Sequence, residues 1–330
     1  MVKIAFAGGS GNVAQEIMDV LFENKKHNIL ILSRKDALVQ KATPGITWAK
    51  TNYSDTNKLA QALQGVHTLL SFVSEEDSSS PNQKTLIDVA VQAGVKRFAP
   101  SEWATSGLSH LGWYAYKGEI RKYLEELNKD KKHLEYTLFQ PGFFVNHRTH
   151  PHQSMKYVQS TELPFDFENR RALMVNGSCD DEISLVTVDD FSNVVARAID
   201  FEGEWPVIGG IRGTIISIRE LIALGEKVRG GTPFHIEKVQ AKDIESGKWQ
   251  TSWAPKLSHP SIPPEYEEVF SRVGVASILL AISKNAYSVS DDWNRLLPDY
   301  KFTAAKDFLS QAWGGKPQTS TEIVDLKALV

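Results

Sequence analysis

A glycine-rich turn near the start of the chain has the residue types that bind a phosphate. The segment 8–14 reads Gly-Gly-Ser-Gly-Asn-Val-Ala and follows the apolar run Lys3–Ala7. A pyrophosphate needs bare backbone N–H groups, no intruding Cβ atoms and a helix N-terminus behind them. Gly8 would make the turn, Gly11 would let the pyrophosphate approach, and Ala14 would let the helix pack on the strand. We expect a dinucleotide here, and a purely structural turn is the alternative.

The residues after the second apolar run, 28–33, select between NAD and NADP. An acidic residue at this point would bind the ribose 2′-hydroxyl of NAD, but the chain has Arg34 and Lys35. A guanidinium matches a 2′-phosphate in bidentate geometry, and an ammonium adds positive charge. The pair predicts NADP(H). Two solvated basic side chains at a strand end are the alternative.

Lys117 lies on the apolar face of a helix predicted over 113–128. The residues that share this face at helical spacing are Trp113, Tyr116, Lys117, Ile120, Tyr123, Leu124 and Leu127. Because burying an unpaired ammonium is costly, the side chain either extends to solvent at the edge of the face or points into a cofactor cleft. In a cleft it could bond the nicotinamide ribose, or act as an acid or base with a lowered pKa.

Alternating strands and helices in the first half of the chain would position these groups. Apolar runs predict strands at 3–7, 28–33, 46–49, 67–73, 97–100 and 136–140, and amphipathic stretches predict helices at 13–22, 54–64, 81–93 and 113–128. This rhythm predicts right-handed βαβ units and a mostly parallel sheet. Beyond it we expect helices at 188–199, 217–228 and 264–282. The predicted fold is α/β, with a doubly wound parallel sheet in residues 1–150 and a smaller α+β substrate region in residues 151–330 that interleaves with it.

Composition and charge exclude several classes of protein. The chain has 330 residues with 37 Lys plus Arg and 40 Asp plus Glu, so its net charge of −3 argues against a nucleic-acid partner. The single cysteine excludes an internal disulfide and a thiolate zinc site. No apolar run approaches the roughly 18 residues that span a bilayer, and the first residues lack a signal sequence. We expect a cytoplasmic monomer or homodimer with a small-molecule substrate and no membrane partner.

Two groups of side chains in the second half of the chain stand apart from these motifs. His147, His150 and His152 could bind a metal, but Pro151 interrupts them and no carboxylate lies nearby in sequence, so we predict no metal site. A loop that lines the substrate cleft is the stronger expectation for this segment. Aromatic residues that could wall a pocket are Trp249, Trp253, Phe270, Tyr287 and Trp293, with an ordinary core as the alternative.

Several stretches together carry a family resemblance. They are 8–14, Arg34, 82–90, Gly94–Trp103 (GVKRFAPSEW), Lys117–Arg121 and Tyr136–Phe144 (YTLFQPGFF). The chain resembles the isoflavone reductase-like, NmrA-like branch of the atypical short-chain dehydrogenases. The likeness covers about residues 2–200 and is thin beyond. Trp103 replaces the usual phenylalanine, and Trp113 occupies the position where an ordinary short-chain dehydrogenase has its tyrosine, four residues before Lys117.

The resemblance implies a Rossmann-type domain that binds NADPH and a small C-terminal region that closes a substrate cleft. Family reductases pass hydride to conjugated or benzylic carbons of aromatic natural products, and Lys117 matches their catalytic lysine. The implied cofactor-binding residues are Gly8, Gly11, Asn12, Val13, Arg34, Lys35, Phe72, Val73, Gln83, Lys117, Pro141, Gly142 and Phe143.

Hypotheses of two classes follow. In the first, the protein is an NADPH-dependent reductase in which Lys117 supplies a proton or stabilises the developing oxyanion. In the second, it is an NmrA-type sensor that binds NADP(H) or NAD(H) without chemistry. Lys117 favours the enzyme, since non-enzymatic members typically lack it, whereas the Pro-Gly-Phe-Phe run favours the sensor. A third hypothesis keeps the enzyme but makes its net reaction redox-neutral, such as an isomerisation or a cyclisation.

Overall fold

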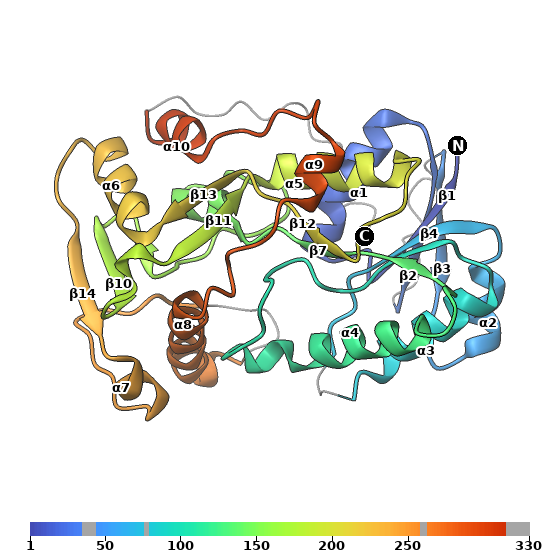
Figure 1. Ribbon diagram of the computed structural model, residues 1–330, viewed down its shortest axis with the longest axis horizontal. Coiled ribbons are helices and arrows are strands. Elements are labelled where there is room, and N and C mark those ends of the chain that lie inside the picture. Colours follow the sequence, from blue (N-terminus) through green and yellow to red (C-terminus); the bar gives the residue numbers. More distant parts are fainter. Residues whose placement is uncertain (35–43, 76–78, 258–262, 315–330) are drawn as a thin grey trace.

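A six-stranded parallel sheet is the largest element of the computed structural model, which describes residues 1–34, 44–75, 79–257 and 263–314 (Figure 1). Its strands are β1 (Lys3–Ala7), β2 (Asn28–Ser33), β3 (Ile46–Lys50), β4 (Val66–Ser71), β5 (Arg97–Ala99) and β6 (Glu135–Tyr136). They lie in the order β3-β2-β1-β4-β5-β6, and every neighbouring pair is parallel. The strand order reverses between β1 and β4. Open α/β sheets bind their ligands at the carboxyl ends of strands at such a point.

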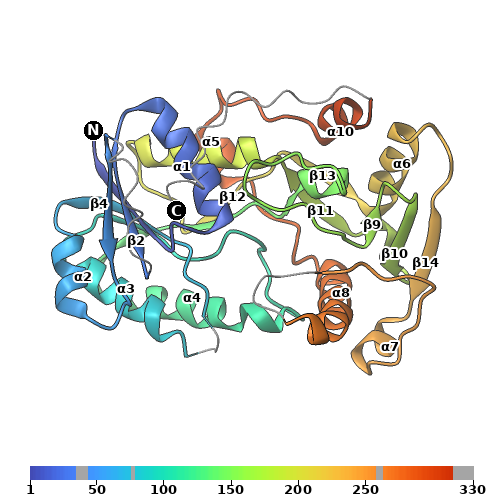
Figure 2. The ribbon, with the colours of Figure 1, turned by 180° about the vertical axis from the view of Figure 1, so that it is seen from behind.

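Both faces of this sheet are covered by helices. Ile4 and Phe6 belong to a core with α1 (Asn12–Asn24) and α5 (Val188–Asp200), whereas Ala5 and Ala7 pack on the opposite side. The helices of that side are α2 (Thr56–Ala62), α3 (Pro81–Gln92) and α4 (Ala115–Leu127). Figures 1 and 2 show α1 and α5 on one face and α3 and α4 on the other. Because both faces are buried, the strands are continuous apolar runs.

The predicted strand 136–140 divides into two. β6 ends the main sheet at Tyr136, whereas β7 (Leu138–Gln140) pairs in parallel with β12 (Ile208–Gly210). Thr137 N still donates to Phe98 O at 3.2 Å, so the chain leaves the main sheet just after this residue. From β7 it runs directly into Pro141–Phe143, which links the main sheet to the second region.

Residue type and position predict Ser54 as the cap of the helix 54–64 and Asp189–Asp190 as the cap of the helix near 188, and both predictions are wrong. Asp55, not Ser54, caps α2 by accepting from Lys58 N at 3.1 Å, because the Ser54 hydroxyl bonds to Asn52. Thr187, not Asp189 or Asp190, caps α5, and its hydroxyl accepts from Asp190 N at 2.9 Å. The predicted helix 113–128 is divided: its first residues lie in a short 3-10 helix, η1 (Gly112–Tyr114), and the α-helix α4 begins only at Ala115.

In its described residues, the second region combines two three-stranded sheets with five helices. The sheets are β8 (Phe143–Phe144), β11 (Glu182–Val186) and β13 (Thr214–Ser217), and β9 (Phe165–Asp166), β10 (Arg171–Val175) and β14 (His235–Val239). The helices are α6 (Ile218–Val228), α7 (Ala241–Glu245), α8 (Glu267–Ser283), α9 (Asp292–Leu296) and α10 (Ala305–Trp313). Further 3-10 turns are η2 (Val145–Thr149), η3 (Ser178–Asp180) and η4 (Pro264–Tyr266). Among the described helices, none is long and apolar enough to cross a membrane.

The two regions share one core. Trp293 of α9 is fully buried and packs with Phe139 of β7 at 5.6 Å between ring centroids. Ile211 and Trp205 also belong to the core that contains β1 and α1. Residues beyond 150 therefore complete the packing of the first region. Figure 1 shows the rest of the second region, with α6, α8, β10 and β14, at the opposite end of the molecule.

Candidate active site

Two glycines shape the turn between β1 and α1. Gly8 has φ +74°, and a Cβ there would lie 3.1 Å from the carbonyl carbon and oxygen of Phe72. Gly11 N donates to Gly8 O at 3.0 Å, and a Cβ on Gly11 would lie 3.3 Å from the same oxygen. A side chain at either position would fill the space that the turn leaves open. The turn therefore has the shape of a phosphate cradle.

The N-terminus of α1 behind this turn is open. Gly11 is its N-cap, no side chain caps it, and its first turn contains no acidic residue. The first backbone bond of the helix runs from Gln15 N to Gly11 O, so the N–H groups of Asn12, Val13 and Ala14 have no acceptor within the helix. Three free N–H groups at a positive helix end fit a pyrophosphate. The phosphate-binding role of these residues stays a prediction.

Tyr53 holds the turn by a hydrogen bond, and the sequence did not predict this role. Its buried hydroxyl accepts from Gly8 N at 3.0 Å, and burial raises the pKa of Tyr53 to about 12. Arg34 is exposed, and its charge lowers that pKa. Lys35 lies outside the described residues. An aromatic residue three positions past β3 is the only sequence signal for Tyr53.

Lys117 is buried at the start of α4. Its side chain is only 4% exposed, so the alternative in which it extends to solvent is wrong. The ammonium donates to the Glu102 carbonyl and lies 3.6 Å from the centre of the Tyr114 ring. Burial lowers the pKa of Lys117 to about 8, with Glu102 raising it and Arg121 lowering it. An ammonium with a pKa this close to neutrality can serve as a proton donor.

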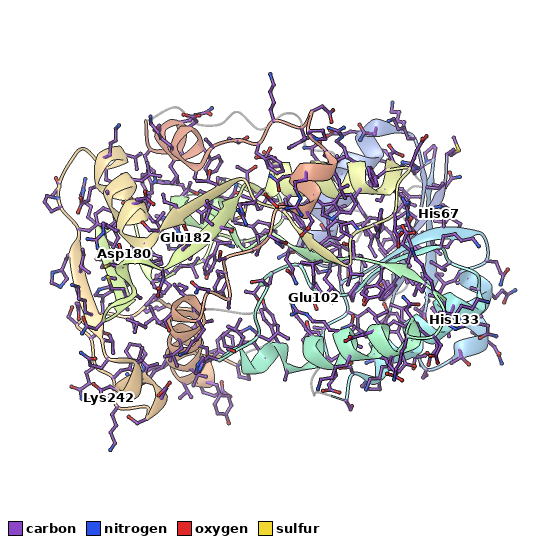
Figure 3. The ribbon with its side chains drawn as sticks, in the orientation of Figure 1. His67, Glu102, His133, Asp180, Glu182 and Lys242 are labelled. Carbon is purple, nitrogen blue, oxygen red and sulfur yellow. The ribbon has the colours of Figure 1, made fainter. Side chains whose placement is uncertain are left out.

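The Glu102 segment, residues 100–106, follows β5 and faces Lys117. A pair between Glu102 and Arg121 holds it in place. The Glu102 carboxylate is 1% exposed and accepts two bonds from the Arg121 guanidinium, at 3.1 Å from Nε and 2.6 Å from Nη2. The same guanidinium donates to the carbonyls of Thr105 and Ser106. Figure 3 shows Glu102 near the centre of the molecule, between the main sheet and the second region. This bidentate pair fixes the Glu102 carbonyl at the lysine.

Gln83 connects the ends of β4 and β5. It is 1% exposed, and its side-chain oxygen accepts from Ser101 N at 3.1 Å and from the Ser71 hydroxyl at 3.4 Å. Trp103 Nε1 donates to the Ser71 carbonyl at 2.7 Å. Gln83 thus holds together the residues at the carboxyl ends of β4 and β5. Its predicted contact with the cofactor is untested.

An aromatic stack follows the carboxyl ends of the strands. The Phe72 ring lies 4.5 Å from the Trp103 ring with an angle of 4° between planes, and Trp103 lies 5.4 Å from Phe139. Phe72 N donates to Ala7 O, and Val73 N donates to the Ser71 hydroxyl. The stack therefore joins the glycine turn to the Glu102 segment.

The segment Pro141–Phe143 lies against the Glu102 segment. Gly142 N donates to Ala104 O at 2.8 Å. Gly142 has φ +70°, and a Cβ there would lie 2.6 Å from Ser184 O, so only glycine fits. Gly142 is thus joined by a hydrogen bond to the residues that follow β5, and the cofactor-binding role of Pro141–Phe143 stays a prediction.

A model of the NmrA-like family matches residues 2–246. The chain belongs to this family. It is 28% identical to the oxidoreductase BOA1 of Botryotinia fuckeliana over 236 residues, which are 70% of this chain and 77% of that protein. It is 22% identical to the oxidoreductase swnN of Metarhizium robertsii over 344 aligned positions, which cover 95% of this chain and 98% of that protein.

A solved structure shows the same fold. AtPrR2, crystallised with NADP+ and (+)-pinoresinol, superposes with a TM-score of 0.66 at 17% identity, covering 94% of this chain and 98% of that chain. This likeness and the strand order confirm the predicted Rossmann-type α/β fold of the NmrA-like chain.

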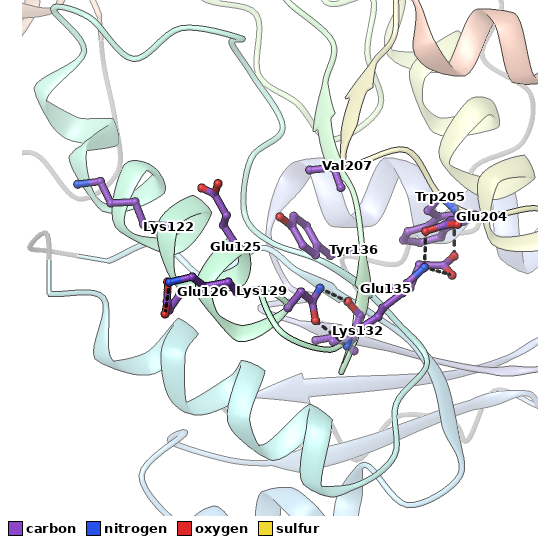
Figure 4. Close-up of a pocket in the computed structure, with 12 residues that line it drawn as sticks. Lys122, Glu125, Glu126, Lys129, Lys132, Glu135, Tyr136, Glu204, Trp205 and Val207 are labelled. Carbon is purple, nitrogen blue, oxygen red and sulfur yellow. Dashed lines mark hydrogen bonds and ion pairs between the residues drawn. The ribbon is translucent and has the colours of Figure 1, made fainter.

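The groove in Figure 4 is separate from this site. It has a volume of about 760 Å³ and lies at Glu135, the first residue of β6, so it opens at the amino end of the sheet. Ion pairs line it, including Lys132–Glu204 at 2.5 Å and Lys129–Glu126 at 3.3 Å. Ligands of open α/β sheets bind at the opposite edge.

The three histidines predicted to form no metal site lie in and after η2. His147 is buried, and burial together with the charge of Arg148 lowers its pKa to about 4. His152 instead contacts the Trp313 ring at 5.4 Å between centroids. Within the described residues, no group of three or more His, Cys, Asp or Glu side chains could hold a metal ion.

The C-terminal aromatic residues do not form one pocket. Trp293 belongs to the core of the first region, whereas Tyr287 stacks on Phe143 and Trp249 packs with α8 in another cluster. Of the aromatic residues suggested by the sequence, Tyr287 is therefore the one that the structure brings next to a predicted site residue.

Proposed function

We propose that this NmrA-like protein is an NADPH-dependent reductase of a small conjugated or aromatic molecule. The cofactor is NADP(H), as in the solved relatives that carry it. The observation that carries the proposal is the position of Lys117. It is a buried ammonium with a lowered pKa, next to the segment that joins the glycine turn to Pro141–Phe143. The oxidoreductase names of BOA1 and swnN support the reaction class.

The cofactor-binding roles follow from the donors that the chain presents. The open N–H groups of α1 bind the pyrophosphate, and Arg34 binds the 2′-phosphate. Gly8 and Gly11 keep the cradle free of Cβ atoms. Pro141–Phe143 would contact the nicotinamide. When bound, NADPH supplies the hydride.

Lys117 performs the proton chemistry. With a pKa of about 8 it is mostly protonated at pH 7, so it can donate a proton or stabilise the oxyanion that develops on the substrate. An ammonium has three donors, and the Glu102 carbonyl accepts one of them. The other two can reach the nicotinamide ribose and the substrate.

The test is a titration of the purified protein with NADPH and NADH, followed by mixing with conjugated aromatic enones and quinones. Loss of reduced-nicotinamide absorbance that depends on the acceptor, together with at least about ten-fold tighter binding of NADPH than NADH, is the expected result. Tight cofactor binding with no turnover on any acceptor would contradict the proposal. That outcome would favour the NmrA-type sensor or a redox-neutral reaction.

A further inference from the structure

Arg148 is a buried guanidinium with no hydrogen-bond acceptor among the described residues. It lies in η2, its side chain is 1% exposed, and its Nε, Nη1 and Nη2 atoms all lack a partner. Burial lowers the pKa of Arg148 to about 10, so the group is still charged at pH 7. A buried charge without hydrogen bonds is strongly destabilising, so a protein that retains one has a use for it.

The groups around Arg148 compensate its charge only in part. Its central carbon lies 5.4 Å from the Phe143 ring centre and 5.3 Å from that of Phe165. Ring faces attract a cation, but they accept none of the five N–H bonds in the way an oxygen does. The donors of the guanidinium are therefore free for an oxygen ligand.

The two carboxylates that line a cavity with Arg148 are hydrogen-bonded to other groups. Asp166 and Glu162 line a small cavity together with Arg148. Asp166 accepts from Arg171 Nε at 2.7 Å, and Glu162 accepts from Lys256 N at 3.0 Å. The cavity, at about 10 Å³, has room for about one water-sized oxygen atom. An acidic group that enters here must therefore displace one of the surrounding rings.

A row of aromatic rings connects Arg148 to Lys117. Phe143, next to the guanidinium, stacks on Tyr287 with 3.7 Å between ring centres. Tyr114 packs against the same hydrophobic cluster that contains Phe143 and Tyr287. The Tyr114 ring lies directly beside the Lys117 ammonium. One end of the row is thus the proposed proton donor, and the other end is an unpaired cation.

We propose that Arg148 binds a carboxylate of the substrate, so that the substrate is an aromatic or conjugated acid. This inference rests on the proposed function, because it takes the row between Lys117 and Arg148 as the substrate side of the site. A guanidinium matches a carboxylate in bidentate geometry, and the rings of Phe143 and Tyr287 would contact the conjugated part of the molecule.

Matched acids and amides test this site without turnover. The probes are cinnamate with cinnamamide, benzoate with benzamide, and acetate with acetamide, each titrated at pH 7 into the complex with NADP+, which cannot supply hydride, and followed by calorimetry. We expect at least one acid to bind about ten-fold or more tightly than its amide. Arg148→Met, which keeps the length of the side chain but removes its charge, should abolish this preference and leave the Kd for NADPH unchanged.

Thermal unfolding gives a second readout that a purely structural arginine would not produce. Arg148→Met should raise the Tm of the free protein, because it removes an unpaired buried charge. The preferred acid should raise the Tm of the wild type but not that of the variant. Arg212→Met is the matched control, since Arg212 donates to the Val289 carbonyl, and there we expect a lower Tm and an unchanged acid preference.

Three results would overturn the proposal. They are equal affinity for acid and amide in all three pairs, an acid preference that survives Arg148→Met, and a variant with a lower Tm and no change in probe binding. If Arg148→Met does not fold, Arg148→Lys replaces it and should weaken the preference by losing the bidentate contact. An acid preference that depends on Arg148, found without turnover of any acceptor, would keep this site and reject the reductase.

Discussion

Gly8 and Arg148 belong to the proposed cofactor side and the proposed substrate side of the site, and these two sides are built in opposite ways. On the cofactor side, one short segment, 8–14, supplies both the glycines and the open helix end, and β1 and α1 hold it in place. On the substrate side, Arg148 and its neighbours Phe165 and Tyr287 come from three separate parts of the chain. The residues of the proposed cofactor side are therefore neighbours in sequence, whereas those of the proposed substrate side come together only by tertiary packing.

Lys117 lies where the two sides meet, and its removal should have the greatest consequence. We expect Lys117→Ala to lower kcat by about 10²- to 10⁴-fold, because the proton donor is lost, while the Kd for NADPH changes only a few-fold. Stopped-flow or steady-state oxidation of NADPH measures kcat, and a fluorescence titration measures the Kd for NADPH.

The control for this variant is Lys122→Ala. Lys122 lies on the same helix, but it is exposed and pairs with Glu119 at 3.0 Å. It should leave both constants unchanged. Normal turnover in Lys117→Ala would remove the lysine from the chemistry.

Gly8→Ala should affect the cofactor side alone. The new methyl group would meet the Phe72 backbone at 3.1 Å and close the cradle, so we expect the Kd for NADPH to rise by about ten-fold or more. The left-handed backbone adds a loss of about 1–2 kcal/mol in the free energy of unfolding. Calorimetric titration with NADPH and denaturant unfolding measure the two effects.

Gly94→Ala separates backbone strain from loss of the cradle. Gly94 has nearly the same φ, +75°, but no atom within 4 Å of an added Cβ. It should lose similar stability and bind NADPH normally. If the two variants bind NADPH equally well, the turn does not hold the pyrophosphate.

Glu102 and Arg121 should change the pKa of Lys117 in opposite directions. Glu102 raises the pKa of Lys117 and Arg121 lowers it. Glu102→Gln should therefore move the alkaline limb of the activity profile to lower pH, and Arg121→Gln should move it to higher pH. At pH 9, where about a tenth of a group with a pKa of about 8 is protonated, a shift of about half a unit corresponds to changes of about three-fold in kcat/KM, in opposite directions. Shifts of the same sign in both variants would assign the pair a purely structural role.

How far sequence predicts this molecule depends on the range of the contacts involved. The order of strands and helices and the segment 8–14 depend on neighbours in sequence, and the structure has them where they were predicted. Helical spacing also placed Lys117 on the apolar face of its helix, but it left open whether the side chain is buried. Tyr53 was missed because its bond to Gly8 joins residues 45 positions apart in sequence. Glu102 was noticed as part of a motif, but its bonds to Arg121 appear only when β5 and α4 pack together.

The predictions of helix boundaries and caps were wrong because these features also depend on contacts that residue type alone does not reveal. Ser54 and Asp55 are both acceptable caps by residue type, and the choice depends on the bond that Asn52 makes to the Ser54 hydroxyl. The unpaired state of Arg148 was even less accessible to prediction. It depends on the absence of an acceptor in residues that come from β9 and η2.

The pH dependence of kcat/KM for acceptor-dependent NADPH oxidation tests the role of Lys117 most directly. With a pKa of about 8, the ammonium that donates the proton is present below that pH and is lost as the pH rises through it. We predict that kcat/KM falls about ten-fold for each pH unit above about 8. A profile that stays flat from pH 6 to pH 10 would contradict the assignment of Lys117 as the proton donor.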